Sequence, residues 1–209
     1  MPLRELAGPA GRLEALLEEP AGDAAVRAAV VLAHPHPQYG GTMHTKAVYR
    51  SAKALAGIGC AVLRFNFRGA GASHGAFDQG QGEMDDFRAG LDVMQARYPA
   101  APMWAGGMSF GSWIALTVGA SDPRVTTLIG IAMPVTRYDF EPVARMVKPK
   151  FFIHGEFDEV CPLKEMRRFY ARSVEPKELV VIDGADHVFD GKVTEVADAI
   201  DDLLGDWCL

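Results

Sequence analysis

Short apolar runs alternate with amphipathic stretches along most of the chain. The short runs, several rich in β-branched residues, predict strands at 13–18, 28–33, 60–65, 103–106, 125–132, 151–154 and 179–182. The stretches with helical periodicity predict helices at 47–58, 84–98, 110–118, 163–171 and 193–204. Strands separated by helices are joined by right-handed crossovers, so the pattern predicts an α/β fold with a doubly wound, mostly parallel sheet flanked by helices. In such a sheet, chemistry is expected beyond the carboxyl ends of the strands.

A glycine-rich turn joins the run at 103–106 to the helix that follows it. Its sequence, Gly107-Met108-Ser109-Phe110-Gly111, fits the G-x-S-x-G pattern of a nucleophile elbow between a strand and a helix. So sharp a turn needs small neighbours, which the glycines supply. We expect Ser109 to be a nucleophile and the N–H of Phe110, at the helix N-terminus, to be one oxyanion donor.

A serine hydroxyl needs a histidine to take its proton and a carboxylate to orient that histidine. Of the two histidines after Ser109, His154 lies inside an apolar strand and is expected to be structural, whereas His187 lies in a loop just after a strand. The turn after the strand that holds His154 carries three carboxylates. Asp158 lies past this turn and is the predicted acid, with Glu156 as the alternative.

A loop rich in histidine and proline follows the first fully apolar run, where the second oxyanion donor is expected. Pro35 and Pro37 have no N–H to offer. The remaining donors are His36, Gln38 and Tyr39, and His36 is favoured by its position after the strand. The paired histidines also suggest a metal site, but no Asp-His pair follows them, so no metal is expected.

The loop at 66–75 resembles a dinucleotide-binding loop at first sight. His74 stands where the third glycine should be, and no helix opens directly after it, so we reject a nucleotide site. We expect instead a rigid loop at the edge of the sheet, with Arg68 paired to an acid on a helix.

Composition narrows the possible partners and the compartment. The 209 residues suit a single domain over 1–209, and the net charge of −6, with no basic patch, argues against nucleic acid as a partner. No apolar stretch approaches the roughly 20 residues that span a bilayer, and the first residues are not expected to form a signal peptide. The cysteines are odd in number and widely spaced, as in reduced, cytoplasmic proteins.

Taken together, the His-Pro-His-Pro loop, the Asn-Phe-Arg-Gly loop and the Gly-x-Ser-Phe-Gly elbow resemble the α/β-hydrolase superfamily over nearly the whole chain. They are most similar to small bacterial hydrolases related to dienelactone hydrolases and carboxylesterases. This resemblance implies hydrolysis of an ester or thioester through an acyl-enzyme, without a cofactor. Serine replaces the cysteine of dienelactone hydrolase, which argues against that substrate. The segment 133–150 is too short for a multi-helix cap, so the site is expected to be open.

The substrate is expected to be a small-molecule carboxylic ester with a short acyl group. Tyr39, Met108 and Tyr138 are predicted to contact it, and the further pocket walls are Phe110, Val135, Val160 and Val188. A thioesterase, amidase or acyltransferase with the same triad remains open, as does a non-catalytic ligand-binding or scaffolding protein on this fold. A homodimer is also possible.

Overall fold

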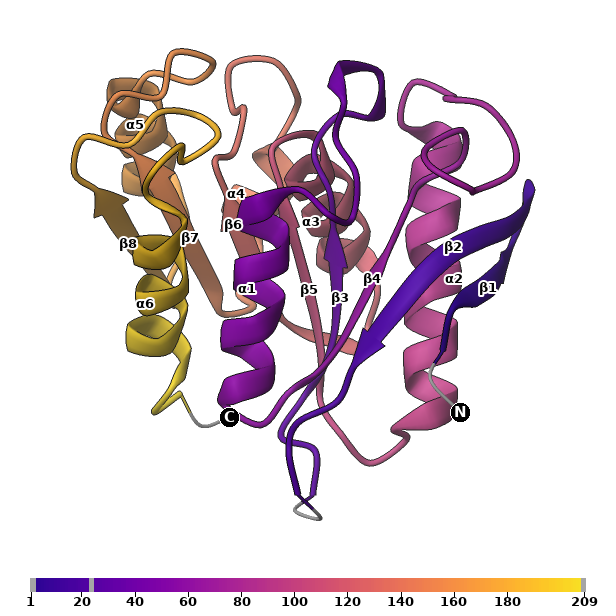
Figure 1. The fold of residues 1–209 in the computed structure, drawn as a ribbon. Helices are drawn as coiled ribbons and strands as arrows, with labels where there is room; N and C mark the ends of the chain where they lie inside the picture. Colours follow the sequence, from indigo (N-terminus) through magenta and orange to yellow (C-terminus); the bar gives the residue numbers. More distant parts are fainter. Residues whose placement is uncertain (1–2, 23–24, 208–209) are drawn as a thin grey trace.

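The centre of the protein is one eight-stranded sheet in the computed structural model, which describes residues 3–22 and 25–207 (Figure 1). The strands are β1 (Glu5–Gly8), β2 (Gly11–Glu18), β3 (Ala29–Ala33), β4 (Ala61–Phe65), β5 (Met103–Met108), β6 (Val125–Ile131), β7 (Lys150–Gly155) and β8 (Lys177–Ile182). Their order is β1-β2-β4-β3-β5-β6-β7-β8. The six strands β3 to β8 are parallel to one another, and β1 and β2 are antiparallel to their neighbours. The predicted mostly parallel sheet is confirmed.

Helices cover both faces of this sheet. They are α1 (Lys46–Gly57), α2 (Gln81–Arg97), α3 (Phe110–Ser121), α4 (Glu141–Arg145), α5 (Leu163–Arg172) and α6 (Val193–Leu204), with one 3₁₀ turn, η1 (Pro37–Tyr39). One apolar cluster joins the sheet to α1 and α6, and a second joins the other face to α2, α3, α4 and α5. Alternate residues of a strand serve the two clusters: Val31 packs in one, Val30 and Leu32 in the other. Within the described residues, no helix is long and apolar enough to cross a membrane.

Two elements were not expected from the sequence. The strand β1 has only four residues and pairs with β2 through a tight hairpin, which is too short to show a period. The helix α4 has five residues and begins with a proline in its first turn. In addition, α2 begins at Gln81 rather than at 84, because the carboxylate of Glu83 accepts the N–H groups of Asp78 and Gly80.

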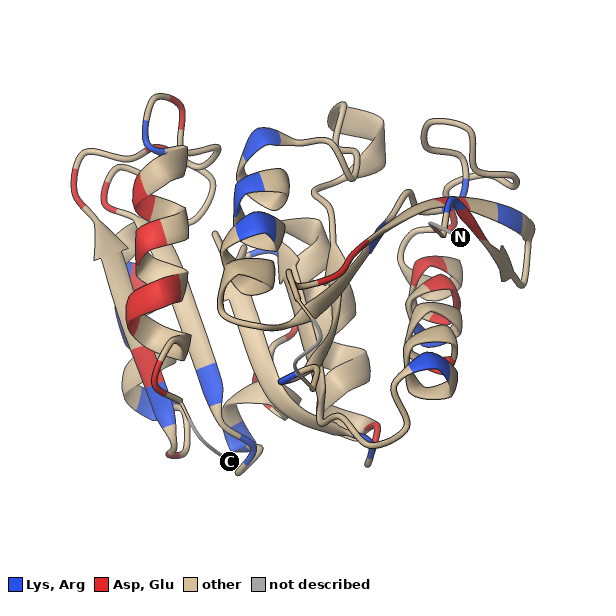
Figure 2. Cartoon of the chain, turned by 60° about the horizontal axis from the view of Figure 1, so that its bottom comes forward, with Lys and Arg blue, Asp and Glu red and all other residues tan. Residues whose placement is uncertain are grey.

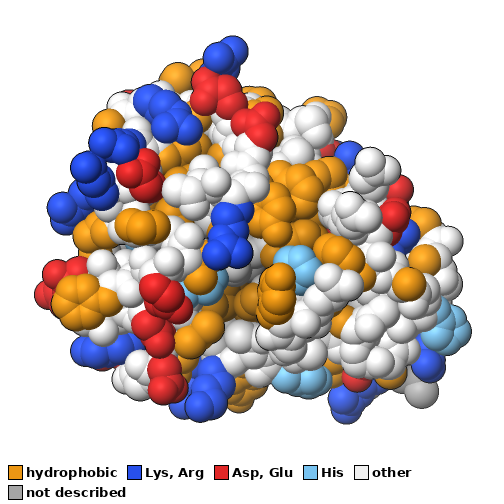
Figure 3. Space-filling view, turned by 90° about the horizontal axis from the view of Figure 1, so that it is seen from above, with side chains coloured by type: hydrophobic (Ala, Val, Ile, Leu, Met, Phe, Trp, Pro, Cys, Tyr) orange, Lys and Arg blue, Asp and Glu red, His pale blue; other side chains and the backbone are white. Residues whose placement is uncertain are grey.

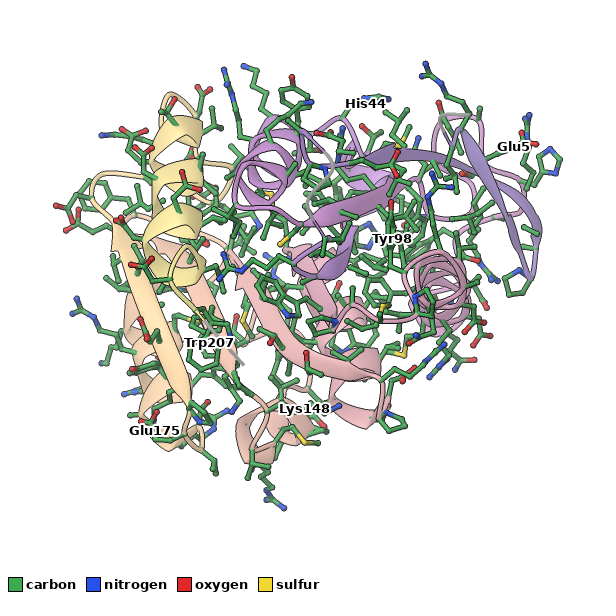
Figure 4. All side chains as sticks on the ribbon, turned by 90° about the horizontal axis from the view of Figure 1, so that it is seen from below. Glu5, His44, Tyr98, Lys148, Glu175 and Trp207 are labelled. Carbon is green, nitrogen blue, oxygen red and sulfur yellow. The ribbon has the colours of Figure 1, made fainter. Side chains whose placement is uncertain are left out.

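Charged residues lie mainly on the helices and at the ends of the strands, while the middle of the sheet carries few (Figure 2). At the end of the sheet that Figure 4 shows from below, Trp207 packs its ring edge-on against Phe151, with ring centroids 5.1 Å apart. The guanidinium of Arg27 donates to the carbonyls of Leu204, Gly205 and Trp207. The end of α6 is therefore tied to the segment that enters β3.

The connection from β6 to β7 decides how open the top of the sheet is. It contains only the short helix α4, so no helical cap covers the carboxyl ends of the strands. These ends and the loops that follow them form the upper edge in Figure 1. The predicted catalytic residues Ser109, Asp158 and His187 follow β5, β7 and β8 at this edge. The expected capless architecture is confirmed.

Candidate active site

The turn at Ser109 is sharply bent between β5 and α3. Ser109 has φ 53° and ψ −123°, a backbone conformation that costs a residue with a side chain about 1–3 kcal/mol. A Cβ atom on Gly107 would lie 2.3 Å from the carbonyl oxygen of Gly111, and one on Gly111 would lie 2.4 Å from that of His34. Both glycines of the motif are thus steric requirements, and the second lets α3 approach the backbone at the end of β3.

Ser109, His187 and Asp158 form a continuous hydrogen-bonded chain. The Oγ of Ser109 lies 2.9 Å from Nε2 of His187, and Nδ1 of His187 lies 2.8 Å from Oδ2 of Asp158. Since a carboxylate can only accept, Nδ1 carries the proton and Nε2 is free to accept the serine proton. The three residues come from the ends of β5, β7 and β8, and the sheet brings them together.

The carboxylate of Asp158 is buried and fully bonded. Burial alone would raise its pKa, but the hydrogen bond and charge of His187 and the N–H of Cys161 outweigh burial, and the pKa is lowered. Its Oδ1 accepts the N–H groups of Val160 and Cys161 at 2.9 and 2.8 Å. The alternative acid, Glu156, is exposed, and its carboxylate accepts the N–H of Gly184 instead.

Below this carboxylate lies the second downstream histidine. His154 is fully buried, and its Nε2 lies 2.8 Å from the carbonyl oxygen of Cys161 and 3.7 Å from Oδ2 of Asp158. Burial lowers the pKa of its imidazole, so the ring is neutral and donates to that carbonyl. His154 therefore packs as a structural residue, but it braces the acid turn, a role that its place in an apolar strand did not reveal.

Neither described cysteine has the character of a nucleophile. Cys60 and Cys161 are free and buried, and burial raises the pKa of their thiols to about 12 and about 11. Cys208 lies outside the described residues.

The histidine–proline loop lies directly beside the elbow. The N–H of Gln38 donates to Nδ1 of His36, and the N–H of Tyr39 donates to the carbonyl of His36. Of the three donors considered, only the N–H of His36 has no acceptor among the described residues. The N–H of Phe110, at the first position of α3, also has none there. The rings of His36 and Phe110 are in contact, with centroids 4.8 Å apart, so two free N–H groups lie on neighbouring segments.

His34 fixes this loop to the neighbouring one. It is completely buried, its Nε2 accepts the N–H of Phe67 at 3.0 Å, and its Nδ1 lies 2.6 Å from the carbonyl oxygen of Pro35. Because Nε2 accepts a hydrogen bond, the ring is neutral and Nδ1 carries its proton, and burial lowers the pKa of His34 to about 4. In the neighbouring loop Arg68 binds Asp86 of α2 through two nitrogens, so the predicted pairing with a helix acid is confirmed.

A pocket of about 230 Å³ opens in front of Ser109 and His187. Its apolar walls are Pro35, Phe110, Pro134, Val160 and Val188, and its polar walls are His36, Tyr39, Arg137 and Tyr138. Seen from above, apolar side chains gather in the middle of this face, with histidine among them and a basic side chain beside them (Figure 3). Tyr39 and Tyr138, both predicted to contact substrate, lie in this wall.

Met108 does not line the pocket, so that expectation was wrong. Side chains alternate along β5, and Met108 points with Trp104 to the face of the sheet that α1 and α6 cover, where it is fully buried. Val135 also lies outside the pocket wall. In contrast, Pro134 and Arg137 line it and were not singled out, although their neighbour Tyr138 was.

No three His, Cys, Asp or Glu side chains of residues 3–22 and 25–207 come together as a metal-binding group would.

Known proteins resemble this chain in sequence and fold. Residues 24–147 match the family model described as serine aminopeptidase, S33. An uncharacterized protein of Rickettsia prowazekii is 37% identical over 98% of this chain and 89% of its own. An alpha-beta serine hydrolase homologue from Coxiella burnetii is 36% identical, with a TM-score of 0.90 over 96% of this chain and 95% of its own. A serine hydrolase without lid from Xanthomonas campestris is 33% identical, with a TM-score of 0.87 over 97% and 92%.

Proposed function

The chain belongs to the serine aminopeptidase S33 family of α/β hydrolases, and from that premise we propose that it hydrolyses small-molecule carboxylic esters through an acyl-enzyme on Ser109. The observation that carries this proposal is the hydrogen-bonded chain from Ser109 through His187 to Asp158, with distances of 2.9 and 2.8 Å. Nucleophile, base and orienting acid are thus in reach of one another before any substrate binds.

In the first half of the reaction, Oγ of Ser109 attacks the ester carbonyl while Nε2 of His187 takes its proton. The carbonyl oxygen becomes an oxyanion, which the N–H groups of His36 and Phe110 are placed to bind. Each such donor contributes about 2.7–4 kcal/mol to the transition state. The C–O bond to the alcohol then breaks, and His187 returns the proton to the leaving alkoxide.

In the second half, water attacks the acyl group on Ser109 with His187 again as base. The acid leaves and the serine regains its proton. Asp158 stays ionised throughout, because its pKa is already low, and it stabilises the imidazolium that forms twice in each cycle.

The family description raises an aminopeptidase as a second candidate. Such an enzyme must bind the ammonium group at the end of a peptide, for which a carboxylate in the pocket is the natural partner. The described pocket wall contains no Asp or Glu, and its one arginine, Arg137, would repel an ammonium group. The pocket therefore favours an ester over an amino-terminal peptide.

A fluorophosphonate probe tests the proposal directly. We expect it to label Ser109, and we expect Ser109→Ala to lower kcat/KM for p-nitrophenyl esters by at least about 10³-fold. Ser121→Ala is the matched control, because Ser121 is exposed at the far end of the same helix and should keep full activity.

Three outcomes separate the candidates. Labelling at Ser109 with ester turnover supports an esterase, and a panel of acyl lengths, thioesters and amides then ranks the substrates. Faster cleavage of aminoacyl p-nitroanilides than of esters would favour the aminopeptidase. Folded protein that neither reacts with the probe nor turns over any ester would refute the hydrolase proposal.

A further inference from the structure

Among the residues that the structure describes, one permanently charged side chain, that of Arg137, lines the pocket. Two other arginines of the fold show the usual alternative, a carboxylate partner: Arg68 binds Asp86, and Arg124 binds Asp122 and Asp92. The guanidinium of Arg137 forms no ion pair or hydrogen bond with any described residue. An exposed cation at the edge of an apolar pocket is thus left with its five N–H donors available.

The backbone that carries Arg137 is fixed. The N–H groups of Arg137 and Tyr138 both donate to the carbonyl of Pro134, at 2.9 and 3.3 Å, which closes a tight turn. The ring of Tyr138 stacks on Trp113 of α3, with centroids 4.4 Å apart and planes 10° from parallel. The turn is therefore anchored to the helix that begins at the nucleophile, and the position of Arg137 relative to the pocket is set by packing.

Two phenol groups share this end of the pocket. Tyr39 and Tyr138 line it, and neither hydroxyl donates to an acceptor among the described residues. Burial raises the pKa of Tyr138, and the charge of Arg137 opposes that rise, which places the guanidinium and the phenol in the same neighbourhood. The nearest acid in sequence, Asp139, accepts the N–H of Glu141 with its Oδ1.

We propose that the site takes esters that carry a second, ionised carboxylate remote from the scissile bond, and that Arg137 binds this carboxylate. The planar fork of a guanidinium matches a carboxylate, and the apolar walls suit the hydrocarbon between the two groups. A local cation is also what a protein of net charge −6 needs to hold an anionic substrate. This inference rests on the proposed esterase function and names its substrate class.

The remote carboxylate can lie on the acyl side or on the alcohol side of the ester. Two matched pairs of substrates distinguish these two positions. For the acyl side, the p-nitrophenyl monoester of adipic acid is compared with p-nitrophenyl heptanoate. For the alcohol side, 4-acetoxybenzoate is compared with 4-acetoxybenzamide. The two members of each pair differ in the remote group, which is a carboxylate in one substrate and a neutral group in the other.

We expect the wild type to prefer the anionic member of at least one pair by about tenfold in kcat/KM, mainly through KM. Arg137→Gln should abolish the preference, measured as the ratio of kcat/KM for the two members of each pair within that variant. Arg50→Gln is the matched control, because Arg50 is exposed on α1, outside the pocket, and its loss changes the net charge equally. High salt should weaken the preference in the wild type and should leave the ratio of the two rates in Arg137→Gln unchanged.

Equal rates within both pairs, or a preference that survives Arg137→Gln, would overturn the inference while the neutral esters still support an esterase. If no ester is turned over, calorimetry decides the inference separately. Monomethyl adipate should bind the wild type at least about fivefold more tightly than it binds Arg137→Gln, and equal affinities would overturn it.

Discussion

The inner and outer parts of the candidate active site are built on different principles. The inner part comprises Ser109, His187, Asp158 and His34, whose side chains are mostly buried and hydrogen-bonded to one another or to the backbone. The outer part comprises Tyr39, Arg137, Tyr138 and Val188, which lie at the rim; Tyr39 is 83% and Val188 53% exposed.

This difference shows where rigidity is needed. A hydrogen-bonded, buried group keeps its geometry before substrate arrives, which lowers the reorganisation required for the reaction. An exposed rim can change its side chains with little cost in stability. Substitutions in the inner part should therefore damage activity or stability strongly, and substitutions at the rim should change only which substrate is bound.

The largest effect is expected from Asp158→Asn. The amide can hold His187 in the wrong tautomer, so kcat for a p-nitrophenyl ester should fall about 10³- to 10⁴-fold. Glu156→Gln, in the same turn but exposed, is the control and should stay near wild type. A loss of less than about tenfold in Asp158→Asn would show that the buried acid does not orient the base.

Gly111→Ala tests the steric side of the inner part. The new Cβ would lie 2.4 Å from the carbonyl oxygen of His34, so the helix and the loop must separate, at a cost of about 3 kcal/mol in the free energy of unfolding. Gly57→Ala is the control, because nothing lies within 4 Å of its Cβ position. Urea unfolding measures both variants, and equal stabilities would contradict the close approach.

His34 should make the stability of the inner part depend on pH. Its folded pKa of about 4 lies below the ordinary 6.5, so its contribution is complete above pH 6.5 and is lost as the pH falls towards 4. Between pH 7.5 and 5 the wild type should lose about 2 kcal/mol through this group. His34→Gln cannot gain the proton, so urea unfolding at both pH values should show a smaller difference in the variant. An unchanged difference would argue against the neutral, buried ring.

The smallest effect is expected at the rim. Val188→Ala should change KM for neutral esters within about threefold, leave kcat unchanged and alter the free energy of unfolding by less than about 0.5 kcal/mol. Val147→Ala, also exposed but outside the pocket, should change neither. A large fall in kcat for Val188→Ala would place the rim within the rigid part and remove the contrast.

The sequence predicted the inner part better than the outer part, for a physical reason. Ser109 and Asp158 follow β5 and β7, two parallel strands of the same sheet with β6 between them, so local motifs and strand order already place both residues at one edge. The wall residue Arg137 depends on how the connection after β6 folds back onto α3, which no short motif specifies. Met108 was predicted to contact the substrate, but the alternation of side chains along β5 turns it to the opposite face of the sheet.

The sequence predicted the boundaries of the longer helices and strands to within a few residues. It did not predict β1 or α4. A continuous run of apolar residues predicts a buried strand such as β3, and the helical period of its apolar residues predicts α6. β1 and α4 are held by their neighbours rather than by a pattern of their own, since four or five residues are too few to show a period.

The short connection between β6 and β7 also affects whether water or an alcohol accepts the acyl group in the proposed reaction. With only α4 in that connection, no described segment closes over Ser109, and an acyl group formed there under the proposed function would be exposed to bulk solvent for its whole lifetime. Solvent then outcompetes any alcohol that is not concentrated or bound nearby. Under the proposed function, this scaffold releases free acids by default, and transesterification requires a crowded supply of acceptor alcohol.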